Sequence, residues 1–204
     1  MTFRVFGYGS LVNRGTLPPH VSARPARLDG WRRAWRAASR VASWGVCAVS
    51  IQEADGDGID GLVVTFEDAM WPVIEAREHR YVSFEVACRV EGAGVEGCGV
   101  EGGGVERAIA FRAEPAADRW GDRGHPVHLT YVDVIVQGFL REFGEGGARR
   151  FMESTDGWHV PVLDDRDAPR YPRAQVLTDR ERAIVDALLA ERGVEVFGGD
   201  TAGR

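Results

Sequence analysis

The sequence contains no lysine, because all 25 of its basic residues are arginine. Schiff-base catalysis, pyridoxal phosphate attachment and a P-loop each require an ε-amine, so the missing lysine excludes these mechanisms. Cysteine is also scarce. The three cysteines, Cys47, Cys88 and Cys98, are widely spaced and form no CxxC pair. This spacing predicts free thiols rather than a disulfide framework or a zinc ribbon.

Long apolar runs are absent as well, since none approaches the roughly 18 residues that a membrane span needs. The N-terminus lacks the basic segment and long apolar stretch of an export signal, so we expect a cytoplasmic protein with no membrane partner. The net charge of -6 argues against nucleic acid as a partner. Arginines do cluster in residues 31–40, but their alternation with tryptophan and small residues favours a half-exposed strand.

Strand-like segments dominate the first half of the chain, at 3–6, 31–37, 46–51, 62–66, 82–90 and 106–113. Helical patterns follow in the second half. We therefore predict one α+β domain over residues 1–204, with a small mixed or mostly antiparallel curved sheet or barrel flanked by helices. A VEGxG repeat predicts a glycine-rich hairpin tip at about 91–104, and a C-terminal extension starts at about 154.

Three helices are expected. The strongest has Thr130 as its N-cap and Gly144 as its stop, around an apolar stripe of Val132, Ile135, Val136, Phe139, Leu140 and Phe143. A second begins at a capping box of Thr178 and Glu181 and ends at Gly193. A shorter helix starts at Asp68, accommodates Pro72 in its first turn and ends close to Glu78.

The stretch FGYGSL, residues 6–11, joins a short apolar strand to two glycines that flank a tyrosine. A dinucleotide fingerprint would need a third glycine where Val12 stands, although Asp29 lies at the distance of a ribose-binding acid. A serine hydrolase would need GxSxG around Ser10, with a base such as His125, His128 or His159. Neither pattern is complete. Backbone N–H groups at the glycine turn could instead hold a carboxylate or a carbonyl oxygen.

Histidines raise the question of a metal site. His125 and His128 could be combined with His79 and a carboxylate, but Pro126 between the first two disfavours an HxxH helix. Two polar loop residues are the simpler interpretation. We expect neither a metal nor a cofactor.

A second segment, VIEAREHRYVSFEV at 73–86, changes the interpretation of the glycine turn. Together with FGYGSL it resembles the γ-glutamylcyclotransferase superfamily, whose members carry an N-terminal YGS loop and a later glutamate at a helix end, followed by a tyrosine and a strand. Two further segments are similar to other parts of that pattern. One is IDGLVVTF at 59–66, and the other is TYVDVIVQGFLREFG at 130–144, a helical segment that opens with Tyr131. The resemblance covers roughly the first 145 residues.

The resemblance implies a role for each matching residue. Glu78 matches the catalytic general acid and base, and the substrate-binding positions match Tyr8, Gly9, Ser10, Leu11, Tyr81 and Tyr131. The chain departs from the glutathione-acting branch at His79 and Arg80, where that branch has glycines. Glu75, where an aspartate is common, is a rival base three residues away.

The implied reaction is the conversion of a γ-glutamyl amine or peptide to 5-oxoproline and the free amine, as in glutathione metabolism. It requires one base, and hydrogen-bond donors for a developing oxyanion. A partly desolvated Glu78 would supply the base, and the N–H groups of Gly9 and Ser10 would supply the donors. A metabolite-binding protein without turnover and a Ser10-dependent hydrolase remain alternatives. Two interpretations of residues 154–175 remain open: the segment wraps over the cavity and selects the acceptor, or it is a surface loop that leads to the last helix. The oligomeric state is open too.

Overall fold

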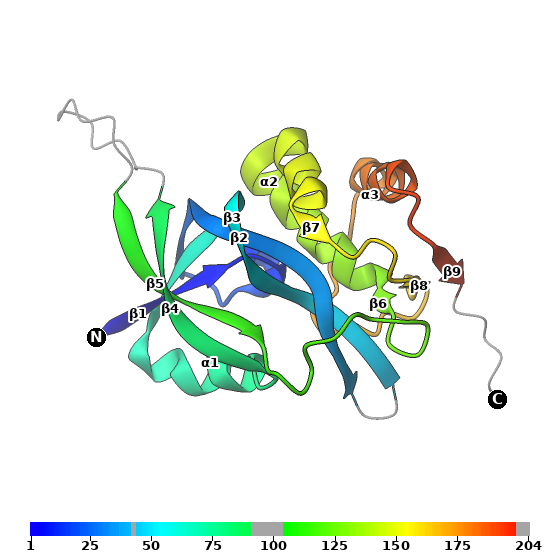
Figure 1. The fold of residues 1–204 in the computed structure, drawn as a ribbon. Helices are drawn as coiled ribbons and strands as arrows, with labels where there is room; N and C mark the ends of the chain where they lie inside the picture. Colours follow the sequence, from blue (N-terminus) through cyan, green and yellow to red (C-terminus); the bar gives the residue numbers. More distant parts are fainter. Residues whose placement is uncertain (42–43, 91–103, 199–204) are drawn as a thin grey trace.

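The computed structural model describes residues 1–41, 44–90 and 104–198. Five strands close into a barrel (Figure 1): β1 (Thr2–Gly7), β2 (Ser22–Val41), β3 (Trp44–Glu67), β4 (Tyr81–Val90) and β5 (Val105–Ala113). The order is β3-β1-β5-β4-β2, and β2 pairs with β3 to complete the circle. Only the β1–β5 contact within it is parallel. The predicted α+β class with a mixed, mostly antiparallel barrel is confirmed.

The β2–β3 hairpin is much longer than the sequence predicts. Glycines and Pro25 divide these segments into short apolar runs, yet the ladder continues across them with register shifts at Asp29/Trp31 and Ala34/Ala37. Such irregularities bend a strand and increase its twist. They let two strands of 20 and 24 residues curve around the barrel.

The tryptophan- and arginine-rich part of β2 differs from the expected half-exposed strand. Arg33 is fully buried, as are its neighbours Ala34 and Trp35, while Arg32 and Arg36 are partly exposed. The Arg33 side chain is enclosed because its guanidinium lies over the rings of Phe139 and Phe151 in α2 (Leu129–Glu153), and β7 (Thr155–Asp156) pairs with β2 at Arg33 and Ala34. The charged side chain at position 33 therefore belongs to the interior.

Helices flank the barrel, with α2 and α3 (Asp179–Glu191) together on one side of it (Figure 1). A 3-10 turn at Asp68–Met70 leads into α1 (Trp71–Arg77), which has Pro72 in its first turn as predicted. Two further 3-10 turns, η1 (Ser10–Val12) and η2 (Arg14–Thr16), follow β1. α3 (Asp179–Glu191) starts at the predicted Thr178–Glu181 capping box. The short strands β6 (Val127–His128), β8 (Val162–Asp164) and β9 (Val196–Gly198) form a second sheet beside the barrel (Figure 1).

The long helix α2 (Leu129–Glu153) corrects two details of the prediction. Its N-cap is His128, and the backbone N–H and hydroxyl of Thr130 both donate to the carboxylate of Asp165, at 2.8 and 2.7 Å. Gly144 does interrupt the helix, with φ of 66°, but helical turns resume after it and continue to Glu153. The cap comes from a residue distant in sequence, which local patterns cannot reveal.

One hydrophobic cluster joins the barrel to the C-terminal elements. It contains Phe6 of β1, Trp35 of β2, Phe139 of α2 and Leu188 of α3. Of the hairpin tip predicted at about 91–104, residues 91–103 lie outside the described residues, and β4 and β5 pair antiparallel on either side of it. In the described part of the chain, no helix has the length and apolar character to cross a membrane.

Candidate active site

A small cavity of about 40 Å³ lies where the loop after β1 meets the end of α1. Every substrate-binding or catalytic residue predicted from the sequence lines it, together with Phe6, Gly7, Val49 and Phe111: Tyr8, Gly9, Ser10, Leu11, Glu78, Tyr81 and Tyr131. We call it the inner pocket. Residues from β1, β3, β4, β5 and α2 thus converge on one point, although they are separated by up to 125 positions in sequence, from Phe6 to Tyr131.

Close packing explains the two glycines of FGYGSL. A Cβ on Gly7 would lie 2.5 Å from Cβ of Leu11, and a Cβ on Gly9 would lie 2.9 Å from Cγ1 of Val49. Both distances are below normal contact, so a side chain at position 7 would prevent the tight turn of the loop onto Leu11, and one at position 9 would prevent its close approach to β3. Among the described residues, the Gly9 and Ser10 N–H groups donate to no backbone oxygen. These two residues line the inner pocket, so their N–H groups are candidate donors to a bound molecule.

Buried Arg33 holds the loop after β1 in place. Its Nε donates to the Tyr8 carbonyl oxygen at 2.8 Å, one Nη donates to Ser154 Oγ at 2.7 Å, and the other donates to the Asp60 carbonyl oxygen. Burial lowers the pKa of Arg33 to about 9, so it still carries its charge at neutral pH. The sequence alone gave no sign of this role, because the residue stands in a cluster of similar arginines.

Asn13 fixes the other end of the loop to α2. Its Nδ2 donates to the Val134 carbonyl oxygen and to Gln137 Oε1, both at 2.9 Å, and its Oδ1 accepts from the Gly15 N–H. Gly138 makes this approach possible, since a Cβ there would lie 2.7 Å from the Asn13 nitrogen. The loop is therefore positioned by α2 as well as by the barrel.

Glu78 follows α1 directly and is its C-cap, with φ of -101° and ψ of 21°. Its N–H donates to the Ile74 carbonyl oxygen, and its own carbonyl accepts from the Tyr81 N–H. The side chain is 16% exposed and lies 3.5 Å from Arg77 Nε. Burial raises the pKa of the Glu78 carboxyl group, and the nearby positive charges of Arg77 and Arg173 oppose this only in part.

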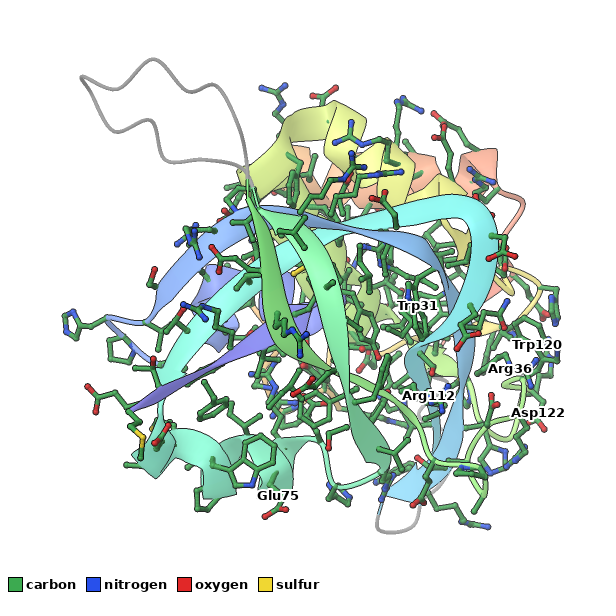
Figure 2. The ribbon with its side chains drawn as sticks, turned by 60° about the vertical axis from the view of Figure 1, so that its left-hand side comes forward. Trp31, Arg36, Glu75, Arg112, Trp120 and Asp122 are labelled. Atoms are coloured by element: carbon green, nitrogen blue, oxygen red, sulfur yellow. The ribbon has the colours of Figure 1, made fainter. Side chains whose placement is uncertain are left out.

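Glu75, the rival base, lies elsewhere. It is exposed and lines neither the inner pocket nor the groove described below. Figure 2 shows it on the outer side of α1, away from the barrel. Of the two carboxylates, only Glu78 meets the glycine turn.

The three tyrosines form the walls of the inner pocket. The Tyr8 hydroxyl donates to the Phe111 carbonyl oxygen at 2.6 Å, and the Tyr81 hydroxyl donates to the Val49 carbonyl oxygen at 2.9 Å. Tyr131 packs edge-on against Trp35. Burial raises the pKa of all three phenols, so each stays protonated. They can act as donors or as packing surfaces, not as bases.

Ser10 is not arranged as a nucleophile. Its Oγ accepts a hydrogen bond from Arg77 at 3.0 Å, and no histidine in the described ranges hydrogen-bonds to it. His125 pairs instead with Asp122. Within residues 1–41, 44–90 and 104–198, no group of three His, Cys, Asp or Glu side chains has the geometry to hold a metal ion. Cys47 and Cys88 are buried free thiols, and Cys98 lies outside the described residues.

A larger cavity of about 640 Å³ opens beside the inner pocket and shares Ser10, Glu78, Tyr81 and Tyr131 with it. We call it the outer groove. Its other walls come from the start of β3, the end of α1 and residues 169–173. Part of the segment 154–175 therefore borders the site, as expected if the segment selects the acceptor. The arginines of this segment could not be identified from the sequence, since single arginines in an arginine-rich chain carry little signal.

Comparisons with known proteins give a result only at the level of structure, because no family model and no curated protein matches the chain. A solved gamma-glutamyl cyclotransferase is similar with a TM-score of 0.58 and 13% identity, over 92% of this chain and 99% of that one. An uncharacterised human protein is similar with a TM-score of 0.59 and 14% identity, over 91% and 98%. YkqA from Bacillus subtilis has a TM-score of 0.51 and 15% identity, over 76% and 56%. The chain therefore has the γ-glutamylcyclotransferase-like fold.

Proposed function

We propose that this chain is a γ-glutamylcyclotransferase-type enzyme, which converts a γ-glutamyl amine or peptide to 5-oxoproline and the free amine. The observation that carries the proposal is that Glu78 lines one small pocket together with Gly9 and Ser10, whose N–H groups donate to no backbone oxygen among the described residues. A carboxylate of raised pKa and a pair of backbone donors are the two groups that this cyclisation requires.

The first step is proton transfer. Glu78 accepts a proton from the substrate α-ammonium group, and the resulting amine attacks the γ-carbonyl carbon. A carbon–nitrogen bond forms and the carbonyl electrons move to oxygen, where the Gly9 and Ser10 N–H groups stabilise the charge. A raised pKa makes Glu78 a stronger base towards an ammonium group than an ordinary glutamate.

The second step expels the amine. Protonated Glu78 returns its proton to the leaving nitrogen, the oxyanion reforms the carbonyl and the old carbon–nitrogen bond breaks. The ring nitrogen passes its remaining extra proton to the solvent, and the released amine takes one up, so the protons balance. Because attacker and carbonyl belong to one molecule, the enzyme's main task is to hold the substrate folded back on itself.

Two alternatives have weaker support. A Ser10-dependent hydrolase would need a base on Ser10 Oγ, and the side-chain donor that reaches this oxygen is Arg77. A metabolite-binding protein without turnover would fit the same pocket, but it would not need a carboxylate of raised pKa beside the donors.

The test is incubation of the purified protein with γ-glutamyl dipeptides, γ-glutamylamines and glutathione, followed by analysis of the products. We expect 5-oxoproline and free amine in equal amounts. Free glutamate without 5-oxoproline would support the hydrolase. Saturable binding with no product would support the binding protein, and either result would reject the proposal.

A further inference from the structure

The outer groove is strongly cationic. Four arginines line it, Arg77, Arg80, Arg170 and Arg173, and Glu78 is its one acidic residue among those described. Arg77 interacts with Glu78, whereas no carboxylate of the described residues lies within 4.0 Å of the other three guanidinium groups. This is unusual for a chain with a net charge of -6, in which many arginines are paired. Clustered unpaired charges in a cavity attract ligands of opposite charge.

The unpaired arginines are held in place by neutral groups. Arg170 stacks on Trp44, with its guanidinium carbon 3.9 Å from the ring centroid. Arg173 stacks on Tyr171 and donates to its hydroxyl at 3.1 Å. Arg80 donates to Ser39 Oγ at 2.6 Å. These contacts orient the guanidinium groups without neutralising them, so they remain able to bind carboxylate or phosphate oxygens.

A second observation comes from His128, which also lines the groove. The residue is only 6% exposed, yet its Nε2 has no hydrogen-bond partner among the described residues. Buried polar atoms normally have partners, because an unpartnered one costs about 1–3 kcal/mol. His128 therefore places an unsatisfied buried polar atom next to the groove.

The position of the groove decides which part of the substrate would occupy it. It shares Glu78, Tyr81 and Tyr131 with the inner pocket, so a γ-glutamyl head in that pocket extends its leaving group into the groove. The lining of the groove also includes apolar side chains, such as Ala37, Val46 and Ala48. The leaving group therefore meets both apolar and cationic side chains.

We infer that the leaving amine of the substrate carries at least two negative charges, bound by Arg80, Arg170 and Arg173. The inference rests on the proposed function and names the acceptor that it leaves open. A dicarboxylic amino acid and a phosphorylated amine share this chemistry. Neutral and cationic amines do not.

The test compares γ-glutamyl-glutamate with γ-glutamyl-glutamine, two substrates of nearly equal shape whose leaving groups differ by one negative charge. We expect kcat/KM to be about tenfold higher for γ-glutamyl-glutamate. A double variant, Arg170→Gln with Arg173→Gln, should lose this preference, so that the ratio of the two kcat/KM values falls towards one. Arg192→Gln removes one positive charge at a position that lines neither cavity, and it should keep the preference. γ-Glutamyl-phosphoethanolamine distinguishes a phosphate acceptor from a dicarboxylate.

Binding to the Glu78→Gln variant separates this inference from the proposed function. Calorimetry with both dipeptides measures affinity without turnover, and the tighter ligand should again be γ-glutamyl-glutamate. If wild type makes 5-oxoproline but uses γ-glutamyl-glutamine equally well, the inference is wrong and the proposed function stands. If no substrate gives 5-oxoproline, the proposed function fails, and equal affinity of the two dipeptides would then reject the inference as well.

Discussion

Glu78 and Glu75 show how one residue's position decides its chemistry. On a regular helix, residues three apart lie on neighbouring positions of one face. Glu78 is the C-cap of α1, and its N–H still donates to the Ile74 carbonyl oxygen as in a helix. Its carboxylate lies at the inner pocket, whereas Glu75 lies on the outer side of α1 (Figure 2). The sequence could name both residues but could not choose between them, because the choice depends on which side of α1 packs against the loop after β1.

The raised pKa of Glu78 predicts a pH-dependent stability. A carboxyl group whose pKa is higher in the folded state contributes stability below its unfolded value, near 4.5, and this stability is lost as pH rises through the folded value. Urea unfolding at pH 4 and pH 7 should show that the Glu78→Gln variant gains stability relative to wild type at the higher pH. An unchanged or smaller difference at pH 7 would contradict a buried Glu78. Glu75→Gln, at an exposed position, should not reproduce the trend.

At the scale of elements, the contact of α2 with the loop after β1 positions the N–H groups of Gly9 and Ser10. A methyl group on Gly138 would lie 2.7 Å from the Asn13 nitrogen and 2.9 Å from the Val12 carbonyl carbon. Both are backbone atoms, which cannot swing aside as a flexible side chain can. The helix and the loop would have to separate.

Gly138→Ala should therefore destabilise the protein by about 1–3 kcal/mol and lower kcat/KM. Gly146→Ala in the same helix is the matched control, since its new Cβ would meet only a terminal nitrogen of Arg150 at 3.5 Å. That change should stabilise the protein by about 0.5–1 kcal/mol. Thermal unfolding and a substrate assay measure both variants, and similar effects at the two positions would reject the close contact.

The elements were predictable to different degrees. α3 was predicted by its capping box and apolar stripe, which are local signals. The cap of α2 was not, because Asp165 reaches Thr130 from 35 residues away. The lengths of β2 and β3 were also underestimated, since the interruptions at Pro25 and the glycines mark bends of a continuous ladder rather than its ends.

At the scale of the whole molecule, barrel closure joins sites that are distant in sequence. The YGS loop follows β1, Glu78 precedes β4, and the cationic wall at 169–173 comes from the C-terminal third. The first two could be paired from the sequence through a resemblance, and both line the inner pocket. The wall at 169–173 could not be assigned to the site from the sequence, because its residues form no motif and only the fold brings them to the groove. A net negative protein thus presents a local cationic groove beside one carboxylate.

The central claim is that the Glu78 carboxylate transfers the proton during ring closure. The most direct measurement is the rate of 5-oxoproline formation by wild type, Glu78→Gln and Glu75→Gln under single-turnover conditions with one γ-glutamyl dipeptide. We expect Glu78→Gln to be slower by about a hundredfold or more with its substrate affinity largely retained, and Glu75→Gln to match wild type. Ring closure at the wild-type rate in the Glu78→Gln variant would contradict the account.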